Sequence, residues 1–335
     1  MTESLRDYEG FSSFETLEDS LFLQESLFNT LKGEFVLDTV EIFKPNAYYG
    51  LDRIVKEFLD IPTEAPLPFA VGHGVTFGIQ PGVYVYGRRE PVPILTYCND
   101  IDLDIISALK SNRTLIHVPH LFSLLVNLRL NRHDTLDKLV FRENLFFPPH
   151  SNVDWRLRDA TDGSIIEMFG NMGLEPKNTS IMLPLTAILA GRHLQYQRVG
   201  FTILTAGHVY DPKFIFRWIN LVGAHSRVVV CNLGSHLFFS LYLQRKVTWL
   251  GINNLNAEKV NEMGQKRPPV YLSSEAVDVL HSLRQGHGPD RRKVLSILGI
   301  HEESKLISYF EEQLKDSYTI GNRMKKLSWY IRKYF

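Results

Sequence analysis

Cysteines, long apolar runs and targeting signals are scarce or absent in this sequence. Its 335 residues include two cysteines, Cys98 and Cys231, and no Cys/His spacing of the kind that binds structural zinc. No apolar run approaches the length of a membrane-spanning helix, and the N-terminus is acidic where a signal peptide would be basic and then apolar. We therefore expect a cytoplasmic protein whose two thiols are buried and reduced.

The chain also has no net charge. Its 37 basic and 37 acidic residues balance, so overall electrostatic attraction does not favour nucleic acid as a partner. The apolar share of 44% and the charged share of 22% are ordinary for a globular protein. The length is sufficient for two domains that each bury a core.

Residues 200–251 have the pattern of a parallel α/β unit. Three short apolar runs rich in β-branched residues predict buried strands, and apolar residues at helical spacing between them predict two helices. Asp211 followed by Pro212 predicts the start of the first helix. Alternating strands and helices with short links predict a doubly wound parallel sheet. The strands cover 201–205, 227–231 and 246–250, and the helices cover 214–222 and 237–242.

Strands and helices also alternate in the rest of the chain. We expect α/β architecture with two Rossmann-like doubly wound domains over 1–148 and 149–318, followed by a basic amphipathic helix over 319–335. The other predicted strands cover 35–42, 69–71, 83–86, 94–98, 114–118 and 179–183, and the other predicted helices cover 51–59, 102–109, 121–130, 164–172, 187–199, 276–283, 291–298 and 302–314.

Two predicted strands end in polar turns, Gly207-His208 and Asn232 to His236. Ligands of such sheets bind outside the carboxyl ends of the strands. Gly234 lets the backbone approach a ligand, and the helix that follows begins with free amides and a positive dipole end, which favour a phosphate. The alternative is that Gly234-Ser235 is only a turn and a helix cap. Two polar turns at neighbouring strand ends favour a ligand site.

A similar turn, Gly72-His73-Gly74, follows the predicted strand 69–71. Two glycines let the main chain bend sharply, so His73 can present its imidazole to a ligand. The alternative is a tight turn with a hydrogen-bonded histidine. The second Gly-His pair, at Gly207-His208, favours the functional interpretation.

The two ends of the chain have distinct compositions. The first 30 residues are rich in acids, and apolar residues at helical spacing there predict a helix that packs on another element. From Ile320 to Phe335 five side chains are basic and none is acidic. A basic aromatic helix of this kind can lie on the inner face of the cell membrane, whereas the alternative is a terminal helix docked on the first domain. The apolar N-terminal positions are Phe14, Leu17, Leu21, Phe28 and Leu31, and those of the C-terminus include Met324, Leu327, Ile331 and Tyr334.

Four segments of the second half bear on function: Phe147–Ser151, Gly200-Phe201, Thr205–Pro212 and Asn232–His236. Together they resemble the GT-B glycosyltransferases encoded with bacterial capsule and O-antigen synthesis genes. The likeness covers roughly residues 140–250, and Gly72-His73-Gly74 adds support from the first half. The family implies two facing α/β domains, of which the second binds the nucleotide-sugar donor.

The resemblance implies transfer of a sugar from a nucleotide-sugar to a glycan or lipid-linked acceptor. Amides and hydroxyls at a helix N-terminus can stabilise the leaving phosphate without a metal. A base in the opposing domain can deprotonate the acceptor hydroxyl, and we expect His73 in this role, with Asp100 and His120 behind it. The expected donor-binding residues are His150, Ser151, Gly207, His208, Asn232, Gly234, Ser235 and His236.

Two absences refine this expectation. Many retaining GT-B enzymes carry a spaced pair of glutamates in the donor-binding segment, whereas Ser235–Gln244 contains no acid. An Asp-x-Asp metal motif is also lacking, since Asp100-Ile101-Asp102 fits better as a helix cap and a surface acid. The missing glutamates favour inversion of the anomeric centre, or a different donor such as a CMP-sugar, over a retaining enzyme. We also expect a metal-independent transferase that needs no cofactor besides its nucleotide-sugar substrate.

Two other functions fit the same fold. A nucleotide-sugar epimerase would need acids and bases beside the sugar ring, but no basic aromatic terminus. A non-catalytic protein that binds nucleotide or glycan within an assembly would keep the turn at Gly234 and would not depend on His73.

Overall fold

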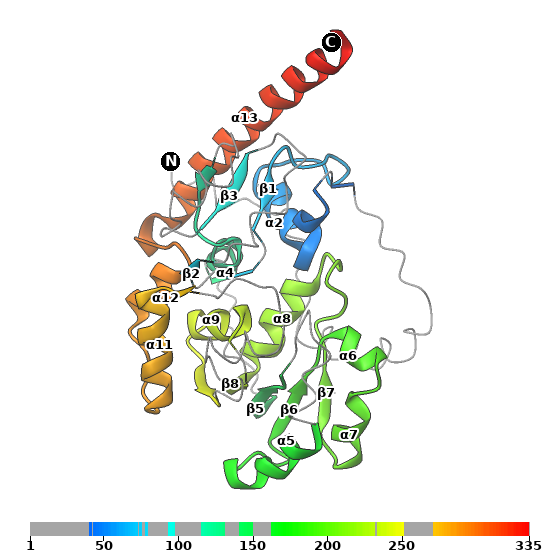
Figure 1. The fold of residues 1–335 in the computed structure, drawn as a ribbon, viewed down its shortest axis with the longest axis vertical. Helices are drawn as coiled ribbons and strands as arrows, with labels where there is room; N and C mark the ends of the chain where they lie inside the picture. The colour runs from blue at the N-terminus through cyan, green and yellow to red at the C-terminus, as the bar shows by residue number, and fades with distance from the viewer. Residues whose placement is uncertain are drawn as a thin grey trace.

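The computed structural model describes most of the chain from residue 40 onward (Figure 1). The predicted α/β class is confirmed, because the described strands form one five-stranded and one three-stranded parallel sheet. Within the described part, no helix is long and apolar enough to cross a membrane. The described residues are 40–41, 43–72, 74–75, 78–79, 93–97, 115–130, 141–149, 162–231, 233–250 and 271–334.

The five-stranded sheet forms the lower part of the molecule in Figure 1. Its strands are β5 (Arg142–Phe147), β6 (Thr179–Met182), β7 (Thr202–Leu204), β8 (His225–Val230) and β9 (Lys246–Trp249). The described helices between them are α5 (Asp162–Phe169), α6 (Leu185–Leu189), α7 (His193–Arg198), α8 (Phe214–Gly223) and α9 (Ser235–Tyr242). The strand order is β7-β6-β5-β8-β9, so the direction of winding changes between β5 and β8, as in doubly wound folds.

Alternate residues of these strands face two different cores. Leu145, Phe147 and Val228 pack in one buried cluster with α8 and α9. Phe146 and Val229 pack in the other, with residues of α5 and α7. A sheet buried on both faces needs apolar side chains at every position, which explains the continuous apolar runs in the sequence.

The smaller sheet lies above, in the order β1-β3-β4. Its strands are β1 (Ala70–Val71), β3 (Ile94–Thr96) and β4 (Leu115–His117), and its helices are α2 (Leu51–Phe58) and α4 (Leu121–Leu130). Before α2 the chain forms a 3-10 segment, η1 (Lys44–Gly50). A separate two-stranded ladder pairs β2 (Gly78–Ile79) with β10 (Tyr271–Leu272), so a C-terminal segment contributes a strand to the first half.

Side chains from before and within α2 hold β1 in place. The Asn46 side chain accepts a hydrogen bond from the Val71 amide (2.8 Å) and donates one to the Phe69 carbonyl (2.8 Å). Beside it, the fully buried Lys56 ammonium lies 2.6 Å from Glu41 Oε1. It also lies 3.3 Å from Asp52 Oδ2. Asn46 Nδ2 also donates to Glu41 Oε2 (3.1 Å), which links the position of β1 to this buried cluster of charges.

The C-terminal helices return the chain to the small sheet. They are α11 (Ser274–Arg284), α12 (Arg291–Ile297) and α13 (Leu306–Tyr334), with a short 3-10 turn, η4 (Glu303–Lys305), before α13. Phe310 and Leu314 are buried, and the Tyr309 hydroxyl donates to the His117 carbonyl (3.2 Å). Gly321 packs so closely that a Cβ there would clash with the Pro68 carbonyl oxygen. Up to Gly321, α13 is therefore docked on the first half of the chain.

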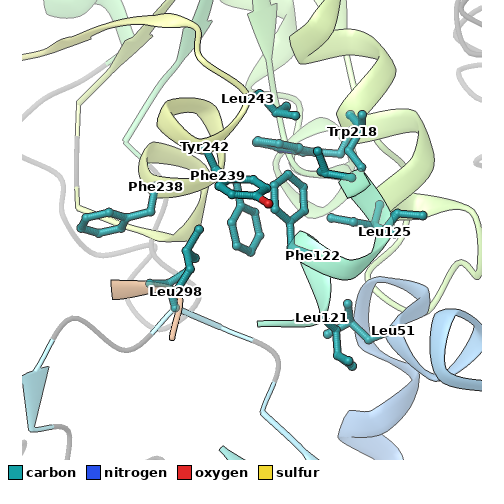
Figure 2. Close-up of a cluster of buried hydrophobic side chains, with 14 of the residues drawn as sticks. Leu51, Leu121, Phe122, Leu125, Trp218, Phe238, Phe239, Tyr242, Leu243 and Leu298 are labelled. Carbon is teal, nitrogen blue, oxygen red and sulfur yellow. The ribbon is translucent and has the colours of Figure 1, made fainter. Parts of the chain in front are cut away.

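One hydrophobic cluster connects the two sheets through α4 (Figure 2). Phe122 of α4 stacks on Phe239 of α9 with the ring centroids 4.0 Å apart. It also meets Trp218 of α8 edge-on at 5.7 Å. Asn127 donates a hydrogen bond to the Tyr242 hydroxyl (2.6 Å). The helices between the sheets thus form a shared core.

Several sequence-based boundaries differ from the structure. β5 is the central strand of the large sheet, whereas the boundary predicted after residue 148 would assign it to the first domain. The predicted helix over 187–199 is two helices separated by Gly191, whose φ is 79°. Asp211 caps the Lys213 amide (2.9 Å), and α8 begins only at Phe214. The helices predicted over 302–314 and 319–335 are one continuous helix, α13.

The buried His225 makes stability depend on pH. Its Nδ1 donates to the Leu221 carbonyl (2.6 Å), and its Nε2 accepts from the Ser180 hydroxyl (3.1 Å). Burial lowers the pKa of His225 from 6.5 to about 4. Between these values the unfolded chain binds the proton and the folded protein does not, so stability present above the unfolded pKa is lost as the pH falls through this window.

We expect the free energy of unfolding to fall by about 3 kcal/mol from this residue between pH 7.5 and pH 4, at 1.36 kcal/mol per unit of pKa. Urea unfolding of His225→Gln should show this pH dependence reduced, whereas the exposed His287→Gln should retain it. Equal slopes in the two variants would contradict the assignment.

Candidate functional site

The segments that follow β5 and β8 meet where the direction of winding changes. β5 ends at Phe147, and α9 begins shortly after β8 with Ser235 and His236. The His236 imidazole stacks on the Phe147 ring, with centroids 5.1 Å apart and planes at 23°. In doubly wound sheets this is the place where a ligand binds. The expected donor-binding residues Ser235 and His236 therefore lie at the predicted edge of the sheet.

Gly234 is required by its neighbour in the folded protein. A Cβ at this position would lie 2.7 Å from Cε1 of His236. The backbone there is extended, with φ of −176°, so the constraint is steric and not conformational. His236 is 8% exposed. From the sequence, Gly234 was predicted to let the backbone approach a ligand. Packing of its backbone against the His236 ring is a second reason for glycine at this position.

The turn after β1 contacts the first residue of α9. The Val75 amide donates a hydrogen bond to Ser235 Oγ (2.8 Å). A Cβ at Gly74 would lie 3.7 Å from the same oxygen. A hydroxyl that accepts one hydrogen bond retains its own proton to donate elsewhere. The carboxyl end of β1 in the small sheet thus meets the carboxyl end of β8 in the large sheet.

The loop after β7 is held by a buried ion pair. Arg217 lies 2.7 Å from Asp211 Oδ2 and donates to the Ala206 carbonyl (3.1 Å). Gly207 has φ of 97°, and a Cβ there would lie 2.7 Å from the Arg217 guanidinium. Both the backbone conformation and the ion pair require glycine at this position.

This loop positions His208 at the carboxyl end of β7. Its Nδ1 accepts a hydrogen bond from the Tyr210 amide (3.2 Å), and the two rings lie 5.8 Å apart. Burial lowers the pKa of His208, and the Asp211 carboxylate opposes this shift. The imidazole is therefore neutral near pH 7, which is the form that accepts a proton.

Tyrosines of η1 complete the surface around His208. The rings of Tyr48 and Tyr210 lie 4.8 Å apart. A hydrogen bond with the Tyr210 side chain, together with burial, raises the pKa of Tyr48 to about 12. The neighbouring Tyr49 adopts a left-handed φ of 62° and donates its amide to the Val209 carbonyl (2.5 Å). Tyr48, His208 and Tyr210 are all half-buried, so they offer ring faces for stacking a sugar or a base.

Arg192 lies at the end of β5. It occupies the turn between α6 and α7, and its guanidinium donates to the Pro149 carbonyl (3.2 Å). A half-buried guanidinium at this edge can bind phosphate oxygens in a bidentate manner. The sequence did not identify Arg192 or Tyr48, because no local motif marks them. Tyr210 lies in the Thr205–Pro212 segment but was not predicted as a site residue. The proximity of all three to the strand ends becomes visible only when the chain is folded.

His120 has surroundings typical of a structural residue. It is 1% exposed, and its Nδ1 accepts the Phe122 amide at the start of α4 (3.1 Å). Its ring packs between Tyr97 (4.5 Å) and Phe239 (4.9 Å). Its amide donates to the Leu298 carbonyl (2.8 Å), so the loop after α12 covers this end of β4. These contacts favour a role in packing over proton transfer to a bound substrate.

The remaining site predictions fall outside the residues that the structure describes. They are His73, Asp100, His150, Ser151 and Asn232. The described neighbours of His73 are Gly72 and Gly74, and the latter lies beside Ser235. In the described ranges, no group of three or more His, Cys, Asp or Glu side chains is arranged to hold a metal ion.

Comparison with known proteins adds no assignment. No family model, no curated protein and no solved structure matches the chain.

Proposed function

We propose that this protein is a GT-B-type glycosyltransferase that transfers a sugar from a nucleotide-sugar to a glycan or lipid-linked acceptor in bacterial surface polysaccharide synthesis. The observation that carries the proposal is the contact between the Val75 amide and Ser235 Oγ. It brings together the carboxyl ends of two parallel sheets, and each such end is a place where ligands bind. A transferase with two substrates needs two facing sites of this kind.

The donor phosphates would bind at the large sheet. Amides of the first turn of α9, the Ser235 hydroxyl and the Arg192 guanidinium can all donate hydrogen bonds to phosphate oxygens. The same donors can stabilise the negative charge that develops on the leaving phosphate. The half-buried rings of Tyr48 and Tyr210 can stack on the base or the sugar.

The acceptor would approach from the small sheet. Its hydroxyl oxygen attacks the anomeric carbon, the bond from that carbon to the phosphate oxygen breaks, and the hydroxyl proton passes to a base. We propose His73 as this base because the turn that contains it adjoins Ser235 at Gly74. A single displacement of this kind inverts the anomeric centre, and the α9 donors supply charge stabilisation from the protein itself.

A thermal-shift screen against free nucleotides and nucleotide-sugars tests the proposal. A ligand present at 100 times its Kd should stabilise the folded state by about 2.7 kcal/mol. Arg192→Gln should weaken binding by roughly tenfold or more, because it removes charge-assisted hydrogen bonds to phosphate. Arg198→Gln is the matched control, since this exposed arginine lies at the other end of α7 from Arg192. A shift that Arg192→Gln leaves unchanged, or no shift with any nucleotide, would contradict the donor site.

A further inference from the structure

The two ends of the chain have opposite charge and the same apolar repeat. Residues 1–31 contain seven acids and one base, whereas residues 320–335 contain five bases and no acid. Positions 14, 17, 21, 24, 28 and 31 follow one another in alternating steps of three and four residues. Five of these six positions are apolar, and Gln24 is the exception. From Ile320 to Tyr334 apolar residues occupy every such position, at Ile320, Met324, Leu327, Ile331 and Tyr334. A repeat of alternating three- and four-residue steps is typical of helices that pair along their length.

Glu41 and Gly321 contact consecutive residues of the chain, Leu67 and Pro68. Glu41 accepts a hydrogen bond from the Leu67 amide (3.1 Å), and Gly321 packs on the carbonyl of the next residue, Pro68. Glu41, ten residues after the acidic segment ends in the sequence, therefore lies near the point where the basic section of α13 begins. Figure 1 shows the last turns of α13 extending past the small sheet, beyond the rest of the described chain.

The lengths of the connection and of the two segments allow them to pair. The connection over residues 32–40 can span about 30 Å. The section of α13 from Gly321 to Tyr334 is about 20 Å long, and residues 14–31 would form a helix of about 26 Å. A short tether of this kind gives a millimolar effective concentration, so even a weak interaction is populated within one chain.

We propose that residues 14–31 form a helix that packs along residues 320–334 of α13 in the same molecule. The two apolar stripes would face each other, and Glu15, Glu18, Asp19 and Glu25 would lie near the basic side chains Arg323, Lys325, Lys326, Arg332 and Lys333. The pairing covers the one strongly basic segment of a chain that has no net charge. It does not depend on transferase activity.

Hydrogen exchange on the full chain tests the pairing. Reversing the acids in Glu15→Lys, Glu18→Lys, Asp19→Lys and Glu25→Lys should speed amide exchange over 320–334 by roughly tenfold, which corresponds to about 1.4 kcal/mol. Adding Lys325→Glu, Lys326→Glu and Arg332→Glu should restore slow exchange, because the charges are again opposite. Exchange over 306–316 should stay unchanged in every variant, since Phe310 and Leu314 hold that section in the core.

Charge reversal at the exposed Glu167 and Glu175 on the large-sheet side is the matched control and should leave exchange over 320–334 unaffected. Equal exchange in the wild type and the acid-reversed variant would overturn the proposal. The proposal would also be overturned if the slow amide exchange over 320–334 became faster on dilution of the protein, because the partner would then be a second copy of the chain. Protection that appears only with anionic lipid vesicles would assign the basic helix to a membrane surface instead.

Discussion

Replacing Lys56 with methionine should lower the free energy of unfolding by about 3–5 kcal/mol. The ammonium is fully buried, 2.6 Å from Glu41 Oε1 and 3.3 Å from Asp52 Oδ2, and it donates to the Thr63 carbonyl at 3.1 Å. Without it, two buried carboxylates remain with no ammonium between them. Urea unfolding at pH 7 measures the loss through the transition midpoint.

Asp52→Asn is the matched control and should cost far less. Burial raises the pKa of Asp52, so the folded protein already disfavours its charged form. Its side chain keeps its proton to a higher pH in the folded state than in the unfolded chain. The contribution to stability therefore falls as the pH rises from the unfolded pKa through the raised one, and asparagine removes this dependence. Equal losses in Lys56→Met and Asp52→Asn would show that the lysine does not compensate the buried charge.

Replacing Phe122 with alanine should both destabilise the protein and separate the unfolding of its two sheets. The ring is fully buried and stacks on Phe239 of α9 across the shared core (Figure 2). Truncating a buried phenylalanine costs about 3–5 kcal/mol. Since Phe122 lies between the sheets, the loss weakens their coupling as well as their stability. Calorimetry should show one transition in the wild type and two in Phe122→Ala.

Phe169→Ala is the matched control for this prediction. Phe169 is 2% exposed and lies in the other core, on the far face of the large sheet. We expect a similar loss of stability with a single transition retained, because the interface between the sheets is untouched. A single transition in both variants would mean that α4 does not couple the sheets.

The large sheet was predicted well because its strands are buried on both faces. The apolar run over 227–231 corresponds to β8 at His225–Val230, and the run over 246–250 corresponds to β9 at Lys246–Trp249. Helical spacing over 214–222 corresponds to α8 at Phe214–Gly223. A run of β-branched residues leaves few conformations to choose from, so local sequence is sufficient.

Features that depend on distant contacts were not predictable in this way. Lys56 and Glu41 look like surface charges, and only the fold reveals that they are buried against each other. Nothing local assigns β5 to the second sheet, because its partners β6 and β8 lie far along the chain. The site shows the same limit. Ser235 was recognised from its turn, but its partner Val75 is 160 residues away.

The side chains around the small sheet protect it from unwanted pairing. An edge strand with free amides and carbonyls is a template on which another chain can add a strand. At β1 the Asn46 amide group takes the place of such a strand, since it binds both the Val71 amide and the Phe69 carbonyl. At the opposite edge the Tyr309 hydroxyl engages the His117 carbonyl of β4. Among the described strands of the small sheet, a side chain of η1 thus occupies the edge at β1 and helix α13 covers the edge at β4, so neither edge is left open to a strand of another chain.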